Sequence, residues 1–157
     1  MATDEIFNVA GSFRDPSGFL FRHAGILYRQ VNESYKDDFD LLMNSGLYES
    51  LTGPGYLIPH TEADIDMRRS DSAYKIIQPE VVPFISYPYE WSFSQLKDAT
   101  LLTLKIQKVA LKFGMSLKDC SAYNVQFFNG KPVFIDTLSF EKHPEGQPWV
   151  AYRQFCQ

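Results

Sequence analysis

Three polar residues near the end of the chain, Asp119, Asn124 and Asp136, have types and spacing that suit a divalent cation. Asn124 opens one apolar run and Asp136 closes the next, so a hairpin made of the two runs would bring these residues together. An amide oxygen beside a carboxylate suits a hard cation such as Mg²⁺, held jointly with phosphate oxygens. Asp119 lies in the loop before the first run, where its carboxylate could orient a hydroxyl group or accept its proton.

The stretch between Asn124 and Asp136 carries a strong hairpin signal. Two apolar runs, 125–128 and 133–135, flank an Asn-Gly-Lys-Pro segment at 129–132. The Asn-Gly pair tolerates the positive φ angles of the turn that joins two antiparallel strands. The sequence therefore predicts that this turn folds the chain back on itself.

Earlier segments predict an antiparallel sheet, one helix within it and a long helix after it. Runs rich in β-branched and aromatic residues alternate with turn residues, and one helical pattern interrupts them. The expected elements are a turn-bearing hairpin at 12–31, a helix at 33–45, a surface loop at 60–73, and strands at 74–77 and 81–85. A long helix is predicted over 93–113, since Ser92 and Gln95 have the form of a capping box before an apolar stripe. The fold class is therefore α+β.

The composition excludes several classes of protein. The chain has 157 residues, of which 45% are hydrophobic and 22% are charged, as in an ordinary globular domain. No run of about 18 apolar residues predicts a membrane span, and the acidic N-terminus shows no secretory leader. Two cysteines, Cys120 and Cys156, favour a reduced cytoplasmic setting over a disulfide scaffold. A net charge of -4 gives no global attraction to nucleic acid, and the histidines lack transition-metal spacing.

The segment around Asp119 resembles the catalytic loop of the protein-kinase-like superfamily, most closely its small-molecule branch, the aminoglycoside and choline phosphotransferases. The family pattern is His-x-Asp-x-x-x-x-Asn, a hairpin and then Asp-Phe-Gly. Here Leu-Lys-Asp-Cys-Ser-Ala-Tyr-Asn at 117–124 and Asp-Thr-Leu-Ser at 136–139 stand in those places, with leucine for the family's histidine and glycine. The resemblance implies that Asp119 is the catalytic base and that Asn124 and Asp136 hold Mg²⁺ with ATP.

The same resemblance implies a two-lobed organisation. Residues 1–86 would form an N-lobe-like sheet with one helix, 87–91 a hinge-like linker, and 92–157 a truncated C-lobe with the catalytic-loop-like hairpin. The residues implied for nucleotide binding are Tyr87, Tyr89 and Glu90 at the hinge, with Arg29 and Lys75 as phosphate contacts. The phosphate-covering loop contains only Gly11 and Gly18, and no Ala-x-Lys motif marks the second or third strand.

Four segments resemble the N-terminal region of bacterial proteins labelled S-adenosylmethionine (SAM)-dependent methyltransferases or nodulation-type proteins. They are Phe-Arg-Asp-Pro-Ser-Gly at 13–18, Tyr-Pro-Tyr-Glu-Trp-Ser-Phe at 87–93, the stretch 116–124, and 149–157. In that family this region precedes a separate Rossmann-type methyltransferase domain, and this chain shows no Gly-x-Gly-x-x-Gly loop after a strand. The resemblance implies a fragment of a longer cytoplasmic protein, with SAM bound only in the attached domain.

Two functions follow from these resemblances. The first is a degenerate kinase-like module that recruits substrate for the attached methyltransferase domain. The alternative is an active ATP- and Mg²⁺-dependent phosphotransferase that acts on a small-molecule hydroxyl group. Neither nucleic acid nor a membrane is an expected partner. A purely structural interpretation stays open as well, in which Asp119 and Asn124 cap a loop, Asp136 ends a strand and the aromatic cluster at 87–91 packs in the interior.

Overall fold

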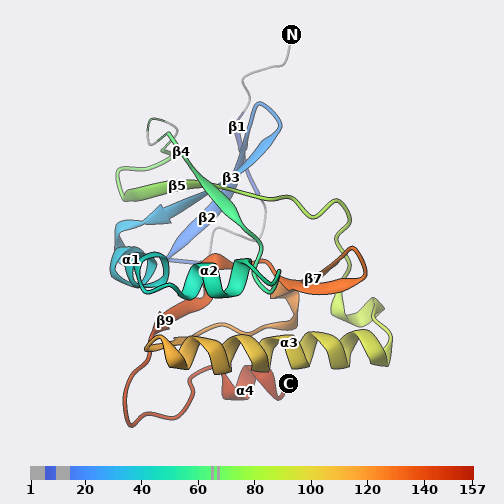
Figure 1. Ribbon diagram of the computed structural model, residues 1–157. Helices are drawn as coiled ribbons and strands as arrows, with labels where there is room; N and C mark the ends of the chain where they lie inside the picture. The colour runs from blue at the N-terminus through green and yellow to red at the C-terminus, as the bar shows by residue number, and fades with distance from the viewer. Residues whose placement is uncertain (1–5, 10–14, 65, 67) are drawn as a thin grey trace. The chain divides into compact units, whose positions relative to one another are not determined.

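The computed structural model describes residues 6–9, 15–64, 66 and 68–157, and it has an α+β fold with an antiparallel sheet (Figure 1). The chain divides into two compact units. We call Met1–Phe39 with Pro59–Val81 the sheet unit, and Asp40–Ile58 with Val82–Gln157 the helix unit. The sequence interpretation grouped 40–58 with the sheet, whereas the contacts assign this stretch to the helix unit.

The sheet unit contains five antiparallel strands in the order β1-β2-β3-β5-β4. Their bounds are β1 Ile6–Asn8, β2 Gly18–His23, β3 Ile26–Asn32, β4 His60–Ala63 and β5 Ala73–Pro79. Phe21 pairs with Tyr28 across β2 and β3, the two rings stack at 5.6 Å, and together with Ile76 they form the core of this sheet. The predicted hairpin is confirmed from Asp15 onward, and residues 12–14 lie outside the described residues.

Two expectations about strands were wrong. His60–Ala63 falls in the predicted surface loop but forms β4, because its polar residues pair with β5, from Ile76 to Pro79. Residues 81–85 form no strand. This apolar run finds no neighbouring strand to pair with, and Pro83 lacks the N–H that a ladder needs.

The predicted helix at 33–45 is confirmed as a 3-10 turn, η1 Glu33–Tyr35, followed by α1 Lys36–Asn44. Gly46, at φ 89°, separates α1 from a second helix, α2 Leu47–Thr52. Because side chains disfavour this left-handed conformation, glycine suits the corner.

The helix unit is built around α3, Phe93–Lys112, whose capping box is confirmed because Ser92 Oγ accepts from the Gln95 N–H and the Gln95 side chain accepts from the Ser92 N–H. The short strand β6 Met115–Leu117 pairs with β9 Phe140–Lys142, and β7 Val125–Phe128 pairs with β8 Lys131–Phe134. The remaining short elements are η3 Pro88–Glu90, η4 Ala122–Asn124, η5 Thr137–Ser139 and α4 Tyr152–Phe155. The β7–β8 turn has Asn129 at φ 50° and Gly130 at φ 74°, which confirms the predicted hairpin.

The core of the helix unit gathers side chains from α2, α3, β6, β7, β8 and β9. Its largest fully buried members are Leu42 of α1, Leu47, Leu51, Leu57, Ile106, Phe134 and Phe140. None of the helices in the described part of the chain combines the length and the apolar character that a membrane span requires.

Candidate functional site

The loop between β6 and β7 is held in place by the segment that enters β9. Leu117 pairs with Phe140, and the N–H groups of Lys118 and Asp119 both donate to the Ser139 carbonyl, at 2.8 and 3.4 Å. Asp119 therefore starts its loop against the residues that follow Asp136, although 20 positions separate Asp119 from Ser139.

Asn124 and Asp136 lie at the adjoining ends of the hairpin. The Ile135 N–H donates to the Asn124 carbonyl at 2.8 Å, and Asn124 Nδ2 donates to Ser139 Oγ at 3.3 Å. Asp136 Oδ1 accepts from the Leu138 N–H at 2.9 Å and so caps η5. The structure thus brings Asp119, Asn124 and Asp136 to one place, with Ser139 hydrogen-bonded to each of them.

The carboxylate of Asp119 is oriented by two donors. Its Oδ1 accepts from the Ser121 N–H at 3.0 Å and from Gln154 Nε2 at 2.8 Å, while Gln154 Oε1 accepts from the Cys120 N–H at 2.7 Å. Ser139 and Gln154 of α4 lie in segments that carry the resemblances, but the sequence assigned neither a role, because both reach the loop only through tertiary folding.

The side-chain types of these three residues suit a hard cation. Two carboxylates and an amide offer oxygen ligands, which Mg²⁺ prefers, and all three residues are half-buried. Among the described residues, Asp119 Oδ2 and Asn124 Oδ1 accept no hydrogen bond from the protein. No group of three or more His, Cys, Asp or Glu residues in the described part of the chain is arranged to hold a metal, so any ion here would rely on the amide and on ligand oxygens.

The aromatic linker divides into a buried part and an exposed part. Trp91 is buried, donates from Nε1 to Ser86 Oγ at 2.8 Å and meets the Phe127 ring edge-on at 5.2 Å. Tyr87 and Tyr89 are exposed and stack on each other at 5.5 Å, and Glu90 Oε2 accepts from the Tyr87 N–H. Glu90 thus shapes η3.

The buried side chain of Gln126, in β7, attaches this linker to the hairpin. Its Oε1 accepts from the Ser86 N–H at 2.9 Å and its Nε2 donates to the Ser86 carbonyl at 3.1 Å. The start of the linker is therefore fixed relative to the strand that Asn124 precedes.

Arg29 and Lys75, the implied phosphate contacts, belong to the sheet unit. Arg29 is buried in β3 and pairs with Asp15 at 3.3 Å. Lys75, in β5, pairs with Glu62 of β4 at 2.9 Å. Both cations already have a carboxylate partner within their own unit.

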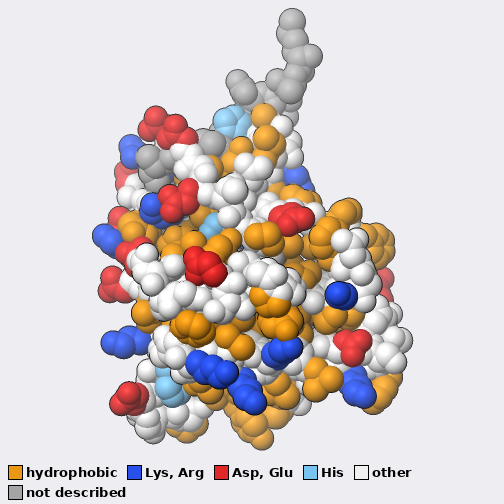
Figure 2. All heavy atoms as spheres, viewed as in Figure 1, with side chains coloured by type: hydrophobic (Ala, Val, Ile, Leu, Met, Phe, Trp, Pro, Cys, Tyr) orange, Lys and Arg blue, Asp and Glu red, His pale blue; other side chains and the backbone are white. Residues whose placement is uncertain are grey.

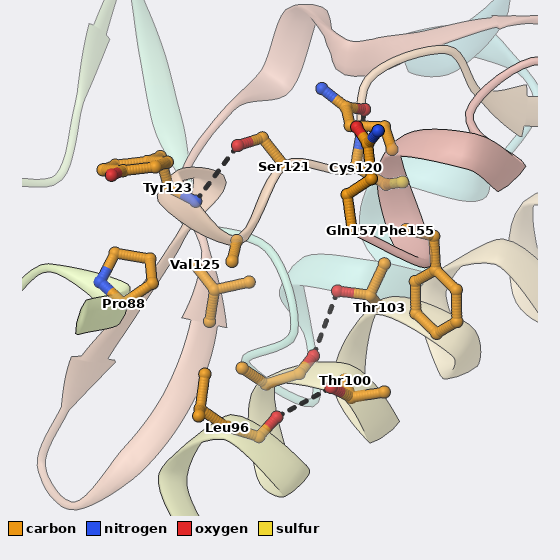
Figure 3. Close-up of a pocket in the computed structure, with 13 residues that line it drawn as sticks. Pro88, Leu96, Thr100, Thr103, Cys120, Ser121, Tyr123, Val125, Phe155 and Gln157 are labelled. Atoms are coloured by element: carbon orange, nitrogen blue, oxygen red, sulfur yellow. Dashed lines mark hydrogen bonds between the residues drawn. The ribbon is translucent and has the colours of Figure 1, made fainter. Parts of the chain in front are cut away.

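A cavity of about 350 Å³ adjoins the loop that carries Asp119 (Figure 3). Its walls come from α3, the 120–125 segment, Pro88 and the chain end, and Gln154, which holds Asp119, is one of its lining residues. Burial raises the pKa of the Cys120 thiol to about 12, and the thiol donates to the Ala151 carbonyl. A thiol that stays protonated near neutral pH is a poor nucleophile, so this cysteine serves packing.

Gln107 of α3 positions the start of the Asp119 loop, since its buried Oε1 accepts from the Leu117 N–H at 2.8 Å. We expect Gln107→Leu to lower the free energy of unfolding by about 2 kcal/mol, because the buried N–H loses its acceptor. Urea unfolding followed by tryptophan fluorescence measures the loss. Gln78→Leu, at an exposed position of β5, is the control and should change little; equal effects in both variants would contradict the assigned role.

No family model matches the sequence. The chain is similar to nodulation protein NoeA of Rhizobium meliloti (strain 1021), with 36% identity over 151 residues, which is 95% of this chain. The chain spans about a third of the length of that relative, since the aligned part makes up 31% of it.

Proposed function

We propose that this chain is a degenerate kinase-like module that recruits substrate for a SAM-dependent methyltransferase domain joined to it in the same polypeptide. The observation that carries the proposal is the convergence of Asp119, Asn124 and Asp136 around η5, combined with the structural use of both carboxylates. Oδ1 of Asp119 and Oδ1 of Asp136 each accept from a nearby backbone N–H, so these side chains shape the loop.

The order of elements supports the kinase-like part of the proposal. An antiparallel sheet with helices inserted after β3 is followed by a linker, the long helix α3, a polar loop, a hairpin and Asp136. This is the order that the resemblance to the protein-kinase-like superfamily implies.

The lack of phosphate-binding groups in the sequence supports the proposal that the kinase-like module is degenerate. Phosphoryl transfer depends on positioned cations and backbone amides that stabilise the charge of the transferred group. The sequence has no glycine-rich phosphate loop, and Arg29 and Lys75 are each paired with a carboxylate. The similarity to part of a longer nodulation protein supports a module that works within a larger polypeptide.

We expect Asp136→Ala, made in the polypeptide that carries both parts, to raise the KM for the methyl acceptor about tenfold and to leave kcat unchanged. The η5 cap is lost, and the recruiting loop loses its shape. Steady-state methyl-transfer kinetics measure both constants. Asp71→Ala, at an exposed position of the sheet unit, is the control. Unchanged KM both in Asp136→Ala and after deletion of residues 1–157 would contradict the recruiting role.

A second candidate, an ATP-dependent phosphotransferase, is favoured by two side-chain oxygens, Asp119 Oδ2 and Asn124 Oδ1, that accept no hydrogen bond from the described part of the chain. In that reaction the γ-phosphoryl group passes from ATP to the acceptor oxygen, Asp119 takes the hydroxyl proton, and ADP leaves. Incubation with ATP, Mg²⁺ and a panel of small alcohols separates the two candidates. The degenerate module leaves ATP intact, whereas ADP formation that Asp119→Asn abolishes would establish phosphotransfer.

A further inference from the structure

The long helix α3 is apolar on two sides. One side packs into the core through Ala99, Leu102, Ile106 and Ala110. The other side exposes large apolar residues, of which Phe93 has 82% of its surface accessible and Leu111 has 45%. An apolar helix face that no other element covers has the character of a binding surface.

Four of the five large apolar residues exposed on α3, together with Thr100, form one row along the helix, and Leu101, which is 53% exposed, lies outside this row. Phe93, Leu96, Thr100, Leu104 and Leu111 follow one another at intervals of three, four or seven positions, and all five are exposed. Side chains at these intervals lie on one face of a helix. At 1.5 Å per residue the row is about 27 Å long. We call these five residues the α3 stripe.

Lysines line one border of the α3 stripe. Lys97, Lys105, Lys108 and Lys112 are exposed and follow the same periodicity, one position round the helix from the stripe. Asp98 is the one acidic residue of α3, so the helix is basic although the whole chain has a net charge of -4. Figure 2 shows Lys side chains beside hydrophobic ones along this helix.

The other border of the α3 stripe opens into the cavity of about 350 Å³. Leu96 and Thr100 belong to both, and Phe155 and Val125 contribute further apolar wall (Figure 3). Among the residues that the structure describes, no charged side chain lines the cavity. The hydroxyl groups of Thr100 and Thr103 donate to the carbonyls of Leu96 and Ala99, so these two walls need no hydrogen bond from a ligand. The volume lies at the small end of the range for ligand pockets, about 300–1,000 Å³.

We propose that the α3 stripe binds an acidic amphipathic helix of a protein partner, with one aromatic side chain anchored in the cavity. A straight apolar row flanked by charge is the surface that receives a helix laid into a groove. The lysine border selects acidic residues on that helix, since opposite charges steer association and like charges oppose it. For the same reason a second copy of this chain is a poor occupant, because a two-fold interface through the stripe would juxtapose the lysine borders. This binding role goes beyond the proposed recruiting function of the Asp119 loop, although the cavity and that loop share Gln154.

Two synthetic helical peptides test the proposal against the purified chain. Both carry the same leucine and phenylalanine face, and the polar face is glutamate in one and lysine in the other. We expect the acidic peptide to bind at least about tenfold more tightly in fluorescence anisotropy, with an affinity that falls as salt rises. Leu104→Glu should weaken it about tenfold, and the Lys97, Lys105 and Lys108 to Glu triple variant should prefer the basic peptide.

The control variant is Ile26→Glu, an exposed apolar position of the sheet unit, which should bind the acidic peptide like the unsubstituted chain. Because Leu104 is exposed, the far-UV circular dichroism of Leu104→Glu should match that of the unsubstituted chain. Equal binding of both peptides, or binding that Leu104→Glu leaves intact, overturns the proposal. A homodimer that is detected by sedimentation and that Leu104→Glu dissociates also overturns it. So does a chain that binds anionic phosphatidylglycerol vesicles but neither of the two peptides.

Discussion

The Phe134→Ala variant is expected to lose about 3–5 kcal/mol of unfolding free energy in the helix unit. Phe134 is fully buried and its ring meets Phe140 at 6.2 Å. Its backbone also donates to the Tyr56 carbonyl and accepts from the Ile58 N–H, both at 2.8 Å. Truncation leaves a cavity in the part of the core that backs the hairpin. Since the free energy of unfolding of a small domain is only about 5–15 kcal/mol, this single change would remove much of the stability.

Both tryptophans, Trp91 and Trp149, lie in the helix unit, so tryptophan fluorescence during urea unfolding reports on this unit. The matched control is Phe93→Ala, which removes an aromatic ring that is 82% exposed and should change the free energy of unfolding by less than about 0.5 kcal/mol. A loss below about 1 kcal/mol in Phe134→Ala would contradict the packing described for β8.

Acidification is expected to destabilise the sheet unit through His60. Burial lowers the pKa of His60 from 6.5 to about 4, and the neighbouring carboxylate of Glu62 only partly opposes this. Between pH 4 and pH 6.5 the His60 side chain is therefore protonated in the unfolded chain and neutral in the folded chain. The stabilisation is complete above pH 6.5 and is lost as the pH falls to about 4, with a total loss of about 3 kcal/mol.

The measurement compares the unsubstituted chain with His60→Phe, which cannot titrate and can still pack against Phe39, 6.1 Å from the His60 ring. Urea unfolding followed by far-UV circular dichroism at several pH values gives the two profiles. The difference between them should change by about 3 kcal/mol from pH 7 to pH 4 and should be constant above pH 7. Parallel profiles throughout would show that His60 is accessible to protons in the folded chain.

Local sequence signals were sufficient for the elements that hold the candidate site. Asn129-Gly130 fixed the turn, because few residue pairs tolerate two positive φ angles, and Ser92 with Gln95 fixed the start of α3. These signals act over a few residues, so they do not depend on the rest of the fold.

The wrong expectations concern segments that need a partner far along the chain. A strand exists only where another strand pairs with it, and propensity is a weak guide to that. The polar segment His60–Ala63 forms β4 because it pairs with β5, whereas the apolar residues 81–85 form no strand. Tertiary contacts also decide the burial of the aromatic residues Trp149, Tyr152 and Phe155 near the end of the chain. Tyr152 is exposed, but Trp149 and Phe155 pack against the core, and Trp149 Nε1 donates to the Leu117 carbonyl at 2.7 Å.

The sequence alone determined that Asp119, Asn124 and Asp136 stand around one hairpin, because the hairpin is encoded within about a dozen residues. Only the tertiary structure decided what surrounds them. The β6–β9 pairing sets Ser139 against the loop, and α4 brings Gln154 to Asp119 across 35 positions. Likewise, the sequence predicted an apolar stripe on the long helix. The structure showed that one part of the apolar surface of this helix packs into the core and that another part stays exposed. Periodicity places residues on a helix face, and only the fold decides which face is covered.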